Sequence, residues 1–217
     1  MINEFASREC IYLLWLATDG SVPLPLLLAP NFDFLFNLPK PGWSRVTLGN
    51  LLVKMRAARL IRFHLNALSS LDESFDIFEA IHEVDFEDRL ISPSYSLTAQ
   101  GGELWEKIFK PRWSEALRHS FIYAESSNEC LFRLESINLK HINSVFGWKS
   151  KERKNLCDSK VVISRATPWY PFYWKQLPCG YIVDSIPEAL LPKQFFQQIP
   201  MWHTNIESLL TSSRPKD

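Results

Sequence analysis

Hydrophobic positions recur at helical spacing in the first half of the chain. Within residues 46–58, four apolar residues stand at positions i, i+3, i+4 and i+7: Leu48, Leu51, Leu52 and Met55. This spacing is typical of one buried helical stripe. The same reasoning predicts an earlier helix over residues 3–17, and a short helix fits residues 24–28. The outward side of the 46–58 helix would carry Val46, Asn50, Val53, Lys54 and Ala57.

Strand-like patterns follow these helices. Ile61, Phe63 and Leu65 alternate with Arg62 and His64, which is the period of a half-buried strand. A second strand fits residues 95–98, followed by a helix that opens at residue 99. The second half contains four short apolar runs that favour strands, at 121–123, 130–134, 160–164 and 181–183, and closing helices at 190–196 and 202–210. The sequence therefore predicts an α+β fold.

The order of these elements resembles a winged helix-turn-helix domain. Two features carry the resemblance: the 46–58 helix runs directly into a strand, and Tyr95-x-Leu97-Thr98-x-x-Gly101 is similar to the segment that closes the wing in many bacterial regulators. The resemblance implies that Tyr95 and Leu97 pack the strand and that Thr98 caps the next helix. The longer string over residues 95–113 resembles bacterial proteins to which we attach no activity.

The resemblance covers residues 1–115, which we expect to form a winged-helix-like domain. Residues 116–217 are expected to form a small, aromatic-rich α+β domain. The connection between the two wing strands departs from the family because it is long and holds an acidic insertion, residues 72–89.

Five aromatic residues fall within six positions of the second half: Trp169, Tyr170, Phe172, Tyr173 and Trp174. Such a run could stack single-stranded nucleic acid or serve as a protein-binding hot spot. We favour a third interpretation, in which these rings form the core of the C-terminal domain and one or two remain at the surface.

Composition excludes some classes of protein. The chain has 217 residues, with 24 Lys and Arg against 24 Asp and Glu, so no overall field draws it to nucleic acid or to a membrane. Its four cysteines are widely spaced and form no CxxC pair, which favours reduced thiols. The apolar run at residues 10–17 is far shorter than a membrane span. We expect a cytoplasmic protein with no membrane partner.

No catalytic motif is visible. The sequence contains no GxSxG, HExxH, GxxxxGK[ST] or GxGxxG, the patterns of common hydrolases, metalloproteases and nucleotide-binding enzymes. Cys157 and His141 could form a thiol–imidazole pair, but a buried structural cysteine is the simpler explanation. The histidines never stand three or four residues apart, as a helical metal pair requires. We expect no enzymatic activity, no metal site and no cofactor.

The acidic insertion favours a protein partner. Residues 72–89 hold eight acidic residues against one arginine, and dense carboxylates accelerate association with a basic surface. The hypothesis is a non-catalytic recognition protein, of the immunity or adaptor type, that occludes a basic target. Its partner-binding residues would be Asp76, Glu79, Glu83, Asp85, Glu87 and Asp88. These acids could instead form a solvated loop that neutralises the neighbouring arginines.

The alternative is a winged-helix transcriptional regulator that binds DNA. Residues 41–71 carry five cations and no acid, and such domains place the second helix of the motif in the major groove. The nucleic-acid-binding residues would be Arg45, Asn50, Lys54 and Arg62. The outward Val46, Val53 and Ala57 suit contact with a protein better than contact with phosphates.

Overall fold

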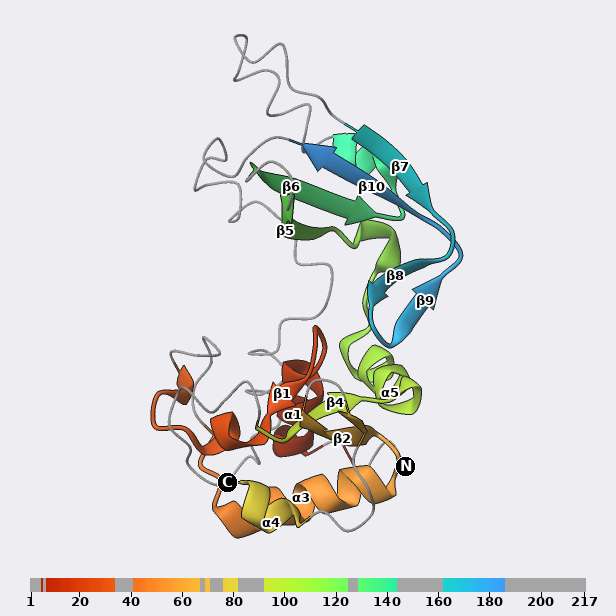
Figure 1. Cartoon of the computed structure of the whole chain (residues 1–217). Coiled ribbons are helices and arrows are strands. Elements are labelled where there is room, and N and C mark those ends of the chain that lie inside the picture. Colours follow the sequence, from red (N-terminus) through yellow and green to blue (C-terminus); the bar gives the residue numbers. More distant parts are fainter. Residues whose placement is uncertain are drawn as a thin grey trace. The chain divides into compact units, whose positions relative to one another are not determined.

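The computed structural model describes residue 5 and residues 7–33, 41–66, 69–70, 76–81, 92–124, 129–143 and 162–185. The chain divides into two compact units (Figure 1), which we describe separately. Unit 1 comprises the chain up to Phe109 together with Phe172–Trp174. Unit 2 comprises Lys110–Pro171 and, among the described residues, those from Lys175 to Ser185. The fold is a mixture of helices and antiparallel sheets.

Unit 1 combines helices with a four-stranded antiparallel sheet. Its elements are α1 (Arg8–Leu16), β1 (Val22–Pro23), the 3-10 helix η2 (Leu24–Leu28), α3 (Arg45–Ala57), β2 (Ile61–Asn66), β3 (Ser69–Ser70), α4 (Ile77–Ala80), β4 (Ser94–Leu97) and α5 (Ala99–Phe109). The strand order is β1-β4-β2-β3. β1 ends at Pro23, which lacks a backbone donor and is therefore tolerated at a sheet edge.

The core of unit 1 draws side chains from α1, α3, α5 and the sheet. One side chain from each of these elements is fully buried: Leu13, Leu48, Tyr95 and Trp105. The hydroxyl of Tyr95 donates a hydrogen bond to the Leu13 carbonyl over 2.9 Å. A tyrosine is stable at this depth because its one polar group has a partner.

The junction between β4 and α5 explains the Tyr-x-Leu-Thr-x-x-Gly pattern. Tyr95 and Leu97 are buried, and the Thr98 Oγ1 accepts a hydrogen bond from the Gly101 N–H over 3.0 Å. The Thr98 N–H donates to the Leu60 carbonyl over 3.0 Å. A Cβ atom at Gly101 would lie 1.9 Å from that same carbonyl oxygen. Glycine is therefore required for α5 to begin this close to the start of β2.

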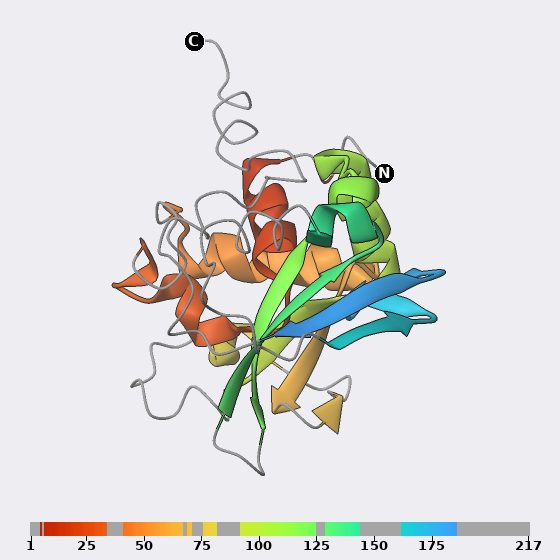
Figure 2. The ribbon, with the colours of Figure 1, turned by 90° about the horizontal axis from the view of Figure 1, so that it is seen from above.

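Unit 2 is built on a second antiparallel sheet, seen from above in Figure 2. Its strand order is β5-β6-β10-β7, and β8 pairs with β9 in a separate hairpin. The elements are the 3-10 helix η4 (Trp113–Glu115), β5 (Arg118–Ala124), β6 (Glu129–Ser136), β7 (Val162–Ala166), β8 (Trp169–Phe172), β9 (Lys175–Leu177) and β10 (Gly180–Ser185). The last residue of β8, Phe172, already belongs to unit 1.

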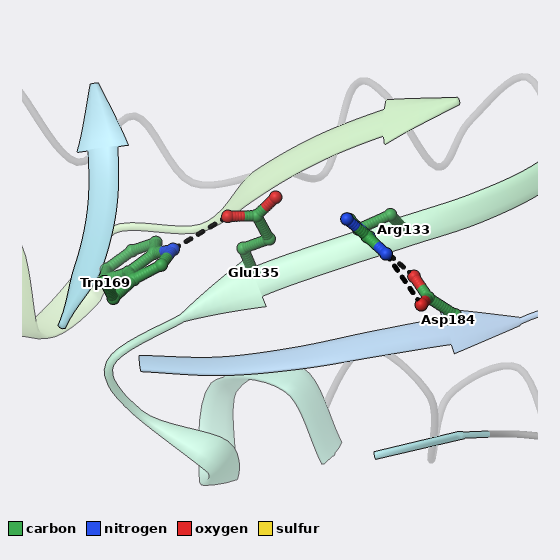
Figure 3. Close-up of polar contacts among 4 residues, drawn as sticks. All are labelled: Arg133, Glu135, Trp169 and Asp184. Carbon is green, nitrogen blue, oxygen red and sulfur yellow. Dashed lines mark hydrogen bonds and ion pairs between the residues drawn. The ribbon is translucent and has the colours of Figure 1, made fainter. Parts of the chain in front are cut away.

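The two faces of the unit 2 sheet differ in polarity. Leu134 on β6 and Val183 on β10 are register partners and are both buried. The next register pair, Arg133 and Asp184, lies on the opposite face because side chains alternate along a strand. These two side chains form a bidentate ion pair with N–O distances of 2.7 and 2.9 Å (Figure 3).

The predicted elements agree with the structure in most places where residues are described. Helix and strand patterns in the first half correspond to α1, η2, α3, β2, β4 and α5, and the four strand candidates of the second half correspond to β5, β6, β7 and β10. The sequence pattern did not predict the β8–β9 hairpin. The predicted helices at 190–196 and 202–210 lie outside the described residues.

The aromatic run is divided between the two units. Trp169 is buried in unit 2, whereas Phe172, Tyr173 and Trp174 belong to unit 1. The sequence interpretation placed these rings in the core of one C-terminal domain, with one or two left at the surface. The division of the run between two units corrects the assignment to one domain, whereas the exposure of one or two rings agrees with the expectation. Tyr170 and Tyr173 remain partly at the surface.

Candidate recognition surface on helix α3

The orientation of α3 is fixed by its cap and by its buried stripe. The N-cap Ser44 accepts a hydrogen bond from the Thr47 N–H over 3.1 Å, which satisfies one of the unpaired donors of the first turn. Leu48, Leu52 and Met55 are fully buried, and Leu51 is half-buried. The predicted inward stripe therefore agrees with the structure.

The opposite side of α3 is open to solvent. Val46 is 62% exposed and Val53 is 43% exposed, which places both among the exposed large hydrophobic residues of the described chain. Asn50, Lys54 and Ala57 are exposed on the same side, since positions four, seven, eight and eleven residues after Val46 share a helical face. We call this set the α3 face: Val46, Asn50, Val53, Lys54 and Ala57.

One flank of α3 is covered by α4, the short helix inside the acidic insertion. The Phe78 ring lies against Gly49, where a Cβ atom would come within 2.4 Å of a ring carbon. The Phe78 carbonyl accepts hydrogen bonds from two guanidinium nitrogens of Arg45, one of them over 2.8 Å. Ile77 and Ile81 are buried beside these contacts. The described part of the acidic insertion, residues 76–81, is therefore attached to the flank of the α3 face.

Two of the six acidic residues predicted to bind a partner, Asp76 and Glu79, lie on α4 or at its start. Asp76 caps α4, and its carboxylate accepts hydrogen bonds from the Phe78 and Glu79 N–H groups over 2.8 and 3.4 Å. Asp76 and Glu79 are both exposed. The remaining four predicted residues lie outside the described residues: Glu83, Asp85, Glu87 and Asp88.

The cations around α3 are mostly engaged in contacts within unit 1. Arg45 holds the Phe78 carbonyl, and the guanidinium of Arg56 lies 5.7 Å from the centroid of the Phe63 ring. Arg62, which is exposed, donates from Nε to the Ser96 hydroxyl over 3.1 Å. Lys54 is the one cation on the α3 face itself. The structure thus brings Asn50 and Lys54 together and gives Arg45 and Arg62 structural contacts elsewhere.

A small polar cluster joins β2 and β4 of the unit 1 sheet around the buried Ser96. His64 Nε2 is 2.8 Å from the Ser96 hydroxyl, which also accepts from Arg62. Burial is the main cause that lowers the pKa of His64, and the positive charge of Arg62 lowers it further. The neutral imidazole is therefore favoured in the folded protein.

Sequence reasoning missed the contact between α4 and α3. The one local indication of this contact in the sequence is Gly49. A glycine inside a helix costs about 1 kcal/mol relative to alanine, and it often marks a place where another element approaches closely. The partner residue Phe78 is 33 positions from Arg45. The residues around Phe78 give no indication of which surface its ring covers.

The described residues of unit 2 form ion pairs and hydrogen bonds within the unit. The Asp184 carboxylate, mainly through its hydrogen bonds, raises the pKa of Arg133. The Trp169 indole N–H donates to Glu135 over 2.7 Å, as Figure 3 shows. Each charged group here has a partner, so the cluster is structural. Among the described residues, no three His, Cys, Asp or Glu side chains gather to hold a metal ion.

In the part of the chain that the structure describes, the helices are too short or too polar to cross a membrane. No protein-family model, curated protein or solved structure matches this chain.

Proposed function

We propose that this chain is a non-catalytic recognition protein that binds a protein partner through the α3 face and the adjoining acidic insertion. An adaptor or immunity-type role, in which the partner carries a basic surface around an apolar patch, fits this chemistry. The observation that carries the proposal is the exposure of Val46 and Val53 on one side of α3.

The two valines favour a protein over a duplex. Fully burying a valine side chain contributes about 1.5–3 kcal/mol, so covering the exposed parts of both would contribute roughly 2 kcal/mol in total. A phosphate backbone would not provide this stabilisation, because phosphates contact cations and hydrogen-bond donors. Among its five residues, the α3 face has one cation, Lys54.

The acidic insertion complements this apolar centre. Its contacts with Arg45 and Gly49 attach α4, which carries the exposed Glu79, beside the α3 face. Polar and charged rims around an apolar centre are typical of protein interfaces. Carboxylates at such a rim raise the association rate with a basic partner.

The second candidate is a winged-helix regulator that binds DNA. The sheet order β1-β4-β2 and the direct passage from α3 into β2 support a winged-helix arrangement. Asn50 and Lys54 are exposed on the helix that would enter the groove. The valines and the acidic insertion count against this candidate, because both oppose a close approach to phosphates.

Interface variants distinguish the two candidates. The full chain and its Val46→Ser/Val53→Ser variant are each purified from the cells that naturally make the protein, and the proteins that co-purify with each are compared. Val162→Ser is the matched control. Val162 is 50% exposed on β7 in unit 2, similar to the two α3 valines. We expect the double variant alone to lose the partner. Salt-sensitive retention of duplex DNA that is lost in Asn50→Ala/Lys54→Ala would instead establish the regulator.

A further inference from the structure

Three residues from late in the sequence complete unit 1. Phe172, Tyr173 and Trp174 belong to unit 1, although the residues on either side of them in the chain belong to unit 2. The bonds of Tyr173 to Ala17 and of Trp174 to Thr18, described next, each join residues 156 positions apart. We call these three residues the aromatic turn.

The aromatic turn is held by directed hydrogen bonds to backbone groups at the ends of elements. The Tyr173 hydroxyl donates to the Ala17 carbonyl over 2.8 Å and accepts from the Leu97 N–H over 2.6 Å. The Trp174 indole N–H donates to the Thr18 carbonyl over 3.1 Å. Ala17 is the C-cap of α1, where carbonyl groups lack helical partners. The turn therefore satisfies two carbonyl groups at the C-terminal end of α1.

The rings also fill a shaped apolar site. Trp174 packs on Gly102 of α5, where a Cβ atom would lie 2.1 Å from the indole. Phe172 and Trp174 stack with centroids 5.5 Å apart, and Trp105 meets both of them at 6.1 and 5.5 Å. Trp105 and Phe172 are buried. Gly102 thus provides the space that the indole occupies.

These contacts resemble those between a peptide-binding site and its ligand. The site consists of backbone groups of Ala17, Thr18 and Leu97, the bare backbone of Gly102 and the ring of Trp105. This site binds a short turn through three side chains of that turn: one phenol, one indole and one phenyl ring. We propose that unit 1 contains a peptide-binding site for an aromatic turn, and that Phe172–Trp174 fills it as an intramolecular ligand. This inference does not depend on the function proposed for α3.

Two consequences follow from this arrangement. The stability of α5 and of the end of β4 depends on whether the site is occupied, and a peptide of the same sequence can occupy it when the turn is disabled. The intact chain resists such a peptide because covalent connection gives the turn an effective concentration on the order of millimolar.

The test uses the full-length Trp174→Ala variant and a synthetic peptide of residues 168–178. Hydrogen exchange is followed at Leu97 and along α5. We expect exchange there to accelerate at least tenfold in the variant, and the peptide to restore protection in a saturable manner. The same peptide with Trp174→Ala should restore nothing. Full-length Tyr170→Ala is the control, since that ring is 52% exposed.

A second variant covers the case in which Trp174→Ala does not fold. Tyr173→Phe keeps the ring but removes the bonds to Ala17 and Leu97, and it should accelerate exchange at Leu97 more than in the middle of α5. Unchanged exchange in both variants would overturn the proposal. Failure of the peptide to protect a folded variant would also overturn it.

Discussion

The ring of Phe78 lies directly against Gly49, so a short helix in the acidic insertion and the central helix of unit 1 meet where one residue has no side chain. Arg45, one helical turn before Gly49, holds the carbonyl of the same phenylalanine. This relationship holds α4, which carries the exposed Asp76 and Glu79, against the flank of α3. The composition of the chain, with its balanced charge, gives no hint of such a local arrangement.

Two glycines with close neighbours should respond differently to alanine. At Gly49 the obstacle is the end of a side chain, Phe78, which can move, and alanine gains about 1 kcal/mol of helix propensity. At Gly101 the obstacle is the Leu60 backbone carbonyl, 1.9 Å from the new Cβ atom. We expect Gly49→Ala to change the free energy of unfolding by less than about 1 kcal/mol and Gly101→Ala to lower it by about 2–3 kcal/mol. Urea unfolding measures both, and similar losses would contradict this account.

Arg59 offers a stabilising substitution. It follows the C-cap of α3 with a φ of 57°, a left-handed conformation that favours glycine. The Leu60 and Arg59 N–H groups bond back to the Met55 and Arg56 carbonyls, the Schellman pattern. We expect Arg59→Gly to raise the free energy of unfolding by about 1 kcal/mol, while Arg59→Val should lower it. Thermal unfolding of the two variants tests the prediction, and a loss of stability with glycine would refute it.

His64 should make unit 1 sensitive to mild acid. Its pKa in the folded protein is lowered from 6.5, first by burial and then by Arg62. The unfolded chain therefore binds the proton at higher pH, and the stabilisation present above pH 6.5 is lost as the pH falls through the folded pKa. We expect His64→Gln, which can still bond Ser96, to show a shallower fall in stability between pH 7 and 5. Equal slopes for the two proteins would show that His64 has no such effect.

The two described free thiols should differ in reactivity. Burial, with a smaller effect of Glu9, raises the pKa of Cys10 to about 12, whereas Cys179 is only half-buried. Because the thiolate is the reactive form, we expect iodoacetamide at pH 8 to modify Cys179 on the order of 100-fold faster in the folded protein. Peptide mass spectrometry after timed quenching measures both sites. The difference should vanish in urea, and rapid labelling of Cys10 without urea would contradict the buried position of α1.

Local patterns predicted the parts of the fold that depend on local periodicity. The stripe of Leu48, Leu52 and Met55 gave the orientation of α3, and Thr98 gave the start of α5. The contacts that define both proposed sites are not local. Phe78 packs on Gly49 and Trp174 packs on Gly102, and in each case the ring contacts a glycine that is distant in the sequence. A hydrophobic pattern alone does not show which of these surfaces meet.

The central claim is that the α3 face binds protein, and Asn50 lies in the middle of that face. A photoreactive amino acid placed at position 50 and activated in the producing cell tests the claim most directly, with position 162 on β7 as the control. The account predicts a crosslinked species at position 50 that protease destroys and nuclease leaves intact. A nuclease-sensitive adduct at position 50, absent from position 162, would contradict the account and assign the face to nucleic acid.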